Sequence, residues 1–134
     1  MAARIAHANL QVSDVSASLT FYRRLGLELV GCLRLDPVVL YYVASPEDPD
    51  LTFELADNPA LESRSPGSGH VALAVGDLDG LVGRLAEEGI EPEKPPFHPG
   101  ERKDLRVCFV QDPDGHRIEL IEGDFPPPQD TPPD

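Results

Sequence analysis

The stretches HANLQVSD (residues 7–14) and HVALAVGD (residues 70–77) decide the fold, because they share one pattern at an offset of 63 residues. Gly26 and Gly89 keep the same offset further along the chain. A second pair of stretches, LTFELAD and HRIELIE, places Glu54 and Glu119 at an offset of 65 residues. A solenoid needs three or more repeats, so a pattern that occurs twice indicates two copies of one supersecondary unit.

The first copy predicts the element order βαβββ. Residues 4–12 alternate between apolar and polar side chains, as a half-buried strand does. A helix is expected over residues of about 16–24, with Ser13 or Asp14 as its cap and Gly26 after its last turn. Three strand-like runs follow, LELVGCLRL, VVLYYVAS and DLTFELAD, separated by Asp-Pro and Pro-Glu-Asp turns.

The second copy predicts the same order. Its expected elements are a strand over 70–75, a helix over about 78–88 capped by Asp77, and strands near 90–93, 105–111 and 116–122. An Asp-Pro-Asp-Gly turn at 112–115 joins the last two strands. The predicted fold class is therefore α+β, with two βαβββ modules that form curved mixed sheets around a metal or substrate cavity.

The domain organisation follows from these elements. A single domain is expected over 1–124, with module 1 over about 4–58, a linker over 59–69 and module 2 over about 70–123. The Pro-rich tail 125–134 is expected to be disordered. The formal net charge of −13 argues against nucleic acid and anionic membranes as partners. The chain has no apolar run near the roughly 20 residues that span a bilayer and no signal-peptide pattern, so a cytoplasmic location is expected.

Four side chains face away from the predicted core. Side chains alternate along a strand, so Glu54 points opposite to Phe53 and Leu55, and Glu119 points opposite to Ile118 and Leu120. His7 and His70 likewise lie opposite the large aliphatic residues of their own strands. If a pseudo-twofold axis relates the two copies, these four side chains can converge on one point.

Two imidazoles and two carboxylates suit a borderline divalent ion, and nickel, cobalt, zinc, iron and manganese are all admissible. A set without thiolates favours an open site with water ligands over a closed structural zinc site. Such a site can activate an oxygen-bearing substrate as a Lewis acid. Of the other two histidines, His98 is a candidate substrate contact, and His116 is expected at the surface of a turn.

Over residues 4–123 the chain resembles the vicinal oxygen chelate superfamily (glyoxalase, bleomycin resistance protein and dioxygenase), and within it the glyoxalase I (lactoylglutathione lyase) type. The segments that carry the resemblance are HANLQVSDVSASLTFYRRLGLELV, LTFELADN, GHVALAVGDLDG and FVQDPDGHRIELIE. The resemblance implies that His7, Glu54, His70 and Glu119 bind one metal ion, with nickel or cobalt preferred over zinc, manganese or iron. It also implies a homodimer with shared sites.

The activity implied by the resemblance is a lyase reaction. A hemithioacetal of a 2-oxoaldehyde and a thiol would be isomerised to an S-2-hydroxyacyl thioester. Glu119 would carry the proton between adjacent carbons, with Glu54 as its counterpart across the metal.

The thiol site matches the glyoxalase I pattern only in part. Gln11 stands where that type usually has an arginine for a glutathione carboxylate, and Glu101-Arg102-Lys103 replaces a Lys-Gly-Gly loop. Asn58 matches a glutathione-contacting asparagine, and Arg64, Arg102 or Lys103 could supply the missing positive charge. The native thiol, or another vicinal-oxygen substrate, therefore stays open.

Two other function classes compete with this interpretation. One is another metal enzyme of the superfamily: a ring-cleaving dioxygenase, an epimerase or a thiol transferase. Glu54 disfavours all three. By the resemblance, dioxygenases and thiol transferases use only two histidines and one glutamate, and an epimerase commonly has glutamine at the place of Glu54. The other is a non-catalytic protein that binds a small ligand or an antibiotic. The presence of all four candidate ligands disfavours this class.

Overall fold

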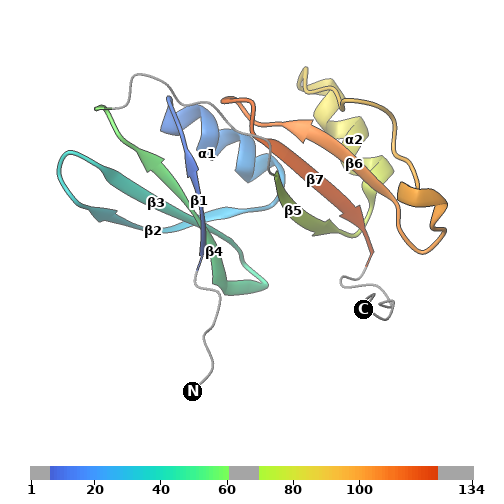
Figure 1. The fold of residues 1–134 in the computed structure, drawn as a ribbon, viewed down its shortest axis with the longest axis horizontal. Coiled ribbons are helices and arrows are strands. Elements are labelled where there is room, and N and C mark those ends of the chain that lie inside the picture. Colours follow the sequence, from blue (N-terminus) through green and yellow to red (C-terminus); the bar gives the residue numbers. More distant parts are fainter. Residues whose placement is uncertain (1–6, 61–69, 124–134) are drawn as a thin grey trace, which may run out of the picture. The chain divides into compact units, whose positions relative to one another are not determined.

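The computed structural model describes residues 7–60 and 70–123. These residues form two compact units: unit 1 comprises residues 7–60 with 112–116, and unit 2 comprises residues 70–111 with 117–123. The elements of unit 1 are β1 (His7–Gln11), α1 (Val15–Arg24), β2 (Glu28–Arg34), β3 (Val39–Ser45) and β4 (Asp48–Asp57). Those of unit 2 are β5 (His70–Val75), α2 (Leu78–Glu87), the 3₁₀ turn η1 (Pro99–Glu101), β6 (Val107–Gln111) and β7 (Arg117–Glu122) (Figure 1).

Unit 1 is a four-stranded mixed sheet with strand order β1-β4-β3-β2. Strand β1 runs parallel to β4, and β3 runs antiparallel to both β4 and β2. The register places Glu54 of β4 between Asn9 of β1 and Tyr42 of β3. Side chains of paired residues lie on the same face of a sheet, so these three share one face.

Helix α1 covers the opposite face of this sheet. The Asp14 carboxylate accepts a hydrogen bond from the backbone N–H of Ala17 (3.1 Å), which satisfies the first turn. After the helix, Gly26 adopts φ +94°, a conformation that disfavours residues with a Cβ. Tyr22 is fully buried, and its ring packs edge-on against Phe53 at 4.9 Å between centroids. The helix therefore packs on the Phe53 side of the sheet, and Glu54 points to the opposite side.

The turn that joins β6 and β7 belongs to unit 1 by its contacts. The buried hydroxyl of Tyr22 donates to Asp112 Oδ2 (2.6 Å), and Ser13 Oγ donates to Asp114 Oδ1 (2.6 Å). The His116 imidazole lies 2.7 Å from the Gln11 carbonyl oxygen through Nε2, and the residue is only 6% exposed. The expectation of a surface His116 is therefore wrong, because this turn packs against β1 instead of facing water.

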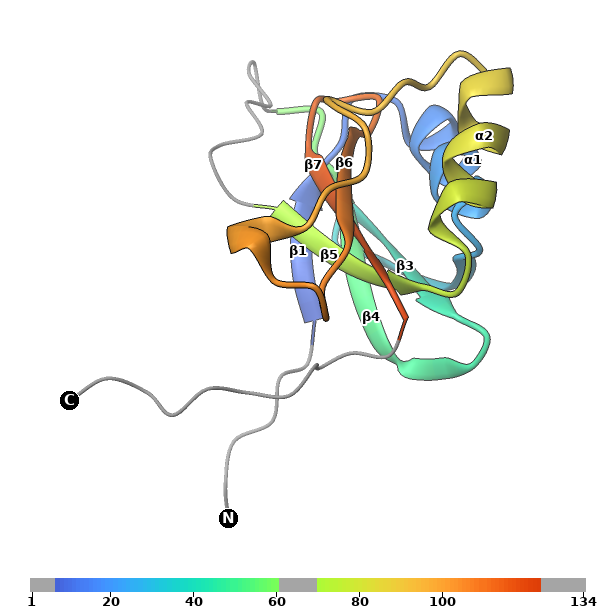
Figure 2. The same cartoon turned by 90° about the vertical axis from the view of Figure 1, so that its right-hand side faces the viewer.

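Unit 2 is a three-stranded mixed sheet with strand order β5-β7-β6. Strand β5 is parallel to β7, and β6 is antiparallel to it, so Glu119 of β7 lies between Ala72 and Phe109. Helix α2 is capped by Asp77 and buries Leu78, Leu81 and Leu85. In Figure 2 it runs along one side of this sheet. The apolar side chains of β7, Ile118 and Leu120, are fully buried on the side opposite Glu119.

The predicted strand at 90–93 is wrong, because those residues form no strand. Glu93 donates one backbone hydrogen bond to the Phe109 carbonyl (2.9 Å), and Phe97 forms one isolated bridge with Val107. Pro92, Pro95 and Pro96 lack the N–H groups that a continuous ladder needs. The segment therefore follows the edge of β6 without adding a fourth strand.

Two small mixed sheets with few helices confirm the α+β class. The expected tail 125–134 and most of the linker 59–69 lie outside the described residues, and the single domain over 1–124 stays a prediction. Neither α1 nor α2, the α-helices of the described part of the chain, has the length and apolar character that crossing a bilayer requires.

Candidate functional site

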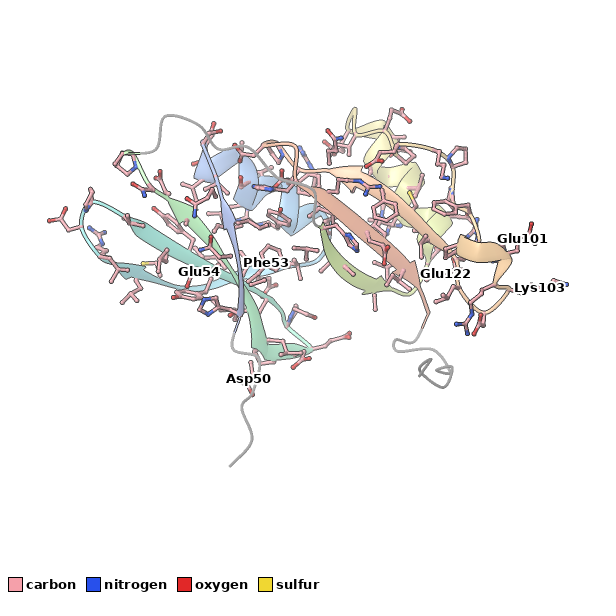
Figure 3. All side chains as sticks on the ribbon, viewed as in Figure 1. Asp50, Phe53, Glu54, Glu101, Lys103 and Glu122 are labelled. Carbon is pink, nitrogen blue, oxygen red and sulfur yellow. The ribbon has the colours of Figure 1, made fainter. Side chains whose placement is uncertain are left out.

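Unit 1 brings His7 and Glu54 together on the face of its sheet opposite α1. The imidazole Nε2 lies 3.2 Å from Glu54 Oε2. Glu54 is 6% exposed, whereas the side chain of His7 is 38% exposed. In Figure 3, Glu54 is labelled on β4 next to Phe53, the residue that contacts α1. The alternation of side chains along β4 therefore separates a packed face from a polar face, as the sequence predicts.

Hydrogen bonds hold both oxygens of the Glu54 carboxylate. Asn9 Nδ2 donates to Oε1 (2.7 Å), and the Tyr42 hydroxyl donates to Oε2 (2.8 Å). Gln11 Nε2 in turn donates to Asn9 Oδ1 (3.0 Å). The hydrogen bond to Glu54 raises the pKa of Tyr42, with smaller contributions from burial and from the carboxylate charge. Glu54 is therefore a buried acceptor with defined donors on both sides.

Unit 2 repeats the pair of imidazole and carboxylate. His70 Nε2 lies 3.7 Å from Glu119 Oε2, with side-chain exposures of 41% and 19%. The ring of His70 meets Phe109 edge-on at 5.5 Å between centroids, just as the ring of His7 meets Tyr42 at 6.1 Å. Both units thus build the same arrangement on equivalent strands.

Arg117 shares the face of Glu119 and was not among the predicted site residues. Its guanidinium lies 4.0 Å over the Phe109 ring and pairs with Glu93 through Nε (2.9 Å). The pairing with Glu93 raises the pKa of Arg117 and lowers that of Glu93. Arg117 lies two residues before Glu119, so the same strand alternation could have identified it.

The two pairs supply the donor types that a divalent metal site requires. Imidazole nitrogen and carboxylate oxygen suit the borderline divalent ions, and in each unit one of each lies on a single sheet face. Within residues 7–60 and 70–123, no three His, Cys, Asp or Glu side chains form a group that could hold a metal ion. Each unit provides two of the four predicted ligands, and their convergence on one cation stays a prediction.

The predicted thiol-site residues differ in their state: Asn58 and Arg102 have partners within their own loops, Lys103 is exposed, and Arg64 lies outside the described residues. Asn58 Oδ1 accepts a hydrogen bond from the Ala60 N–H (3.0 Å). Arg102 pairs with Asp104 and lowers the pKa of that carboxyl group. Lys103 is exposed in the loop around η1 (Figure 3), and Arg64 is not described. In the same loop, His98 Nδ1 lies 2.6 Å from the Leu105 carbonyl oxygen.

Asn9 and Tyr42 are further site residues that the sequence did not assign. Asn9 lies two residues after His7 in β1 and therefore shares its face of the sheet. Tyr42 reaches Glu54 through the pairing of β3 with β4, a register that the sequence alone does not define. Asn9 and Tyr42 therefore belong to the polar face of unit 1, together with His7 and Glu54.

Comparison with known proteins identifies the family. The model of the Glyoxalase/Bleomycin resistance protein/Dioxygenase superfamily matches residues 4–120. The chain is 34% identical to a lactoylglutathione lyase of Salmonella typhimurium over 128 residues, which cover 89% of this chain and 92% of the relative.

Solved structures agree with this assignment. A mutant glyoxalase I from Zea mays aligns with a TM-score of 0.78 at 24% identity, covering 90% of this chain but only 45% of that one. A trypanothione-dependent glyoxalase I from Leishmania major aligns with a TM-score of 0.73 at 26% identity, covering 90% of this chain and 87% of that one. The chain therefore belongs to the Glyoxalase/Bleomycin resistance protein/Dioxygenase superfamily and is an enzyme of its glyoxalase I type.

Proposed function

We propose that this protein is a metal-dependent lyase that isomerises a hemithioacetal of a 2-oxoaldehyde and a thiol to an S-2-hydroxyacyl thioester. The observation that carries the proposal is the same His–Glu pair in both units, on the face of each sheet opposite its helix. The curated relatives at 31–34% identity, all named lactoylglutathione lyase, support the reaction class.

The ligands of the metal would be His7 and Glu54 from unit 1 with His70 and Glu119 from unit 2. The glyoxalase I relatives imply a divalent ion, and we propose nickel or cobalt ahead of zinc, manganese or iron. When bound, the ion would supply Lewis-acid stabilisation of the negative charge that develops on the vicinal oxygens of the substrate.

Glu119 is the residue that we assign to proton transfer. Its carboxylate would take the proton from the carbon that bears sulfur and hydroxyl, and return it to the neighbouring carbonyl carbon. The hydroxyl proton of the first carbon passes to the former carbonyl oxygen, so the thioester is an isomer of the substrate and the atoms balance. Glu119 is more exposed than Glu54, 19% against 8% for the side chains, which favours access to a substrate carbon.

The thiol that fits this chain is one that needs no cation at position 11. Gln11 is neutral and donates to Asn9. Three arginines of unit 2 are already paired: Arg102 with Asp104, Arg106 with Asp79 and Glu122, and Arg117 with Glu93. A thiol with fewer carboxylates than glutathione, which carries two, therefore suits the site better.

We also propose a homodimer with shared sites, located in the cytoplasm. Edge strand β2 leaves Leu29, Val30 and Leu33 between 46% and 49% exposed. A long apolar edge is a ready place for another chain to pair, so monomeric proteins usually cover or charge it. Analytical ultracentrifugation between 1 and 100 μM tests the dimer, and a monomer across this range contradicts it.

One experiment tests the reaction and the metal together. Protein purified without added metal is analysed for metal content, then assayed by thioester absorbance with methylglyoxal and either glutathione or 2-mercaptoethanol. About one divalent ion per chain and turnover that a chelator abolishes are expected. Metal-bound protein without turnover favours another metal enzyme of the superfamily. Metal-free protein indifferent to chelator favours a binding protein.

A further inference from the structure

The carboxylates of Glu54 and Glu119 occupy equivalent places but have different neighbours. Each lies in the central strand of its sheet, opposite one residue on a parallel strand and one on an antiparallel strand. For Glu54 these neighbours are Asn9 and Tyr42, and both donate hydrogen bonds to it. For Glu119 they are Ala72 and Phe109, whose side chains have no hydrogen-bond donor.

The two donors restrict Glu54 in a specific way. One binds Oε1 at 2.7 Å and the other binds Oε2 at 2.8 Å, so rotation of the carboxylate breaks at least one bond. Glu54 is also the more buried of the two, and a buried carboxylate that loses a donor is left poorly solvated. Displacement of Glu54 is therefore more costly than displacement of Glu119.

Gln11 fixes the orientation of the Asn9 amide. Its Nε2 donates to Asn9 Oδ1 at 3.0 Å, which leaves the Asn9 amide nitrogen to face Glu54. The hydrogen bonds run from Gln11 to Asn9 along β1 and then from Asn9 across to Glu54 on β4. The residue that replaces a usual arginine thus supports the carboxylate network.

We propose that Asn9 and Tyr42 are positioning residues that hold Glu54 as the fixed metal ligand, while Glu119, whose neighbours Ala72 and Phe109 offer no donor, keeps the proton-transfer role assigned to it above. This division of roles rests on the proposed function. Neither residue touches the reacting atoms, because both act through Glu54. The two units differ at these equivalent positions, because unit 1 has Asn9 and Tyr42 where unit 2 has Ala72 and Phe109.

Exchange of these neighbours tests the proposal directly. The N9A/Y42F variant gives Glu54 the neighbours of Glu119, and the A72N/F109Y variant gives Glu119 those of Glu54. In Tyr42→Phe the ring against His7 is retained, so only the hydroxyl is lost. Circular dichroism and thermal melting identify any variant that fails to fold, and the single variants then replace it.

The first measurement is metal affinity, by competition with a chromophoric chelator. N9A/Y42F should raise the Kd of the metal by about 10–100-fold, the usual range for residues that orient a ligand. At saturating metal, its kcat should fall less than that of A72N/F109Y. A72N/F109Y should lower kcat at least tenfold and leave the Kd unchanged or tighter. Equal effects of both variants on Kd and kcat would overturn the proposal.

A second measurement needs neither metal nor substrate. In metal-free protein, ¹³C relaxation of the side-chain carboxyl groups should report a more ordered Glu54 than Glu119. N9A/Y42F should lower the order of Glu54 to that of Glu119. Equal order in the wild type contradicts the proposal, even if the reaction is confirmed. Unequal order with no thioester formed supports the positioning role and rejects the reaction.

Discussion

The units keep the same pair of histidine and glutamate but surround it differently. In unit 1 the polar face carries Asn9 and Tyr42, whereas unit 2 has Ala72 and Phe109 at the equivalent places. The contrast extends to the core, where Tyr22 of α1 is buried with its hydroxyl on Asp112, and Leu85, at the same offset of 63 residues, is a buried aliphatic in α2. The two units thus keep the same pair of histidine and glutamate and differ in the side chains that contact the glutamate.

Glu119→Gln gives the largest expected effect and tests which unit supplies the base. The amide keeps the shape of the side chain but cannot accept the proton, so kcat should fall about 10²–10⁴-fold at saturating metal. Initial rates of thioester formation provide the measurement. Glu54→Gln is the matched control, and its main effect should be weaker metal binding. A larger loss of kcat in Glu54→Gln at full metal occupancy would reverse the assignment of the two carboxylates.

Tyr22→Phe tests the buried polar contact that unit 1 has and unit 2 lacks. The substitution removes the donor to Asp112 Oδ2, a bond of 2.6 Å in a buried site. Loss of one partner of a buried hydrogen bond costs about 1–3 kcal/mol of the free energy of unfolding. Denaturant unfolding measures it.

The control for Tyr22→Phe is Tyr41→Phe. Tyr41 lies on β3 and is only half-buried, so its variant should change stability much less. Equal losses in both variants would mean that the contact with Asp112 contributes nothing particular to unit 1.

Gln11→Arg tests whether residue 11 of this chain supports Glu54 through Asn9 instead of binding a carboxylate of the thiol. A guanidinium can bind a glutathione carboxylate, so kcat/KM with glutathione should rise about tenfold, the equivalent of one charge-assisted hydrogen bond. The loss of the bond to Asn9 should weaken metal binding slightly.

The matched substrate for this variant is 2-mercaptoethanol, which has no carboxylate. Its kcat/KM should not rise in Gln11→Arg, because the new cation has nothing to bind. A rise with both thiols would indicate a general effect on the metal site and not recognition of a carboxylate.

The sequence predicted the local features of the fold well, because these depend on neighbours in the chain. Asp14 and Asp77 cap the helices as expected, and Gly26 and Gly89 adopt positive φ after them. Side-chain alternation also placed Glu54 opposite Phe53. The absence of a strand at 90–93 was predictable in principle, because Pro92 lies within this segment and Pro95 and Pro96 follow it.

Features that depend on register or distant packing were not predictable. Tyr42 is a donor to Glu54 only because β3 pairs with β4 in one particular register. His116 is buried because the turn after β6 packs on unit 1, far from it in sequence. The sequence defined the ligand candidates but not which of the two glutamates is restrained.

Glu93→Gln gives the smallest expected effect and probes a residue of unit 2 that has no counterpart in unit 1. Arg117 pairs with His70 in register, where unit 1 has Thr52 opposite His7, and Glu93 binds its guanidinium at 2.9 Å. Both side chains are more than a third exposed and water screens such pairs, so the loss of stability should be about 0.5 kcal/mol or less.

The pH dependence of this loss follows from the direction of the pKa shift. The hydrogen bond from Arg117 lowers the pKa of Glu93 in the folded protein, so its contribution is present above the unfolded pKa of about 4.3 and is lost as pH falls through the lower, folded value. The difference in Tm between the wild type and Glu93→Gln should be constant from pH 5 to 7 and shrink below about pH 4. Asp104→Asn, which removes the ion pair between Asp104 and Arg102 in the loop around η1, is the matched control for one surface ion pair. If Glu93→Gln alone also changes kcat, the released Arg117 acts on Glu119, and the polar face of unit 2 includes a cation that unit 1 lacks.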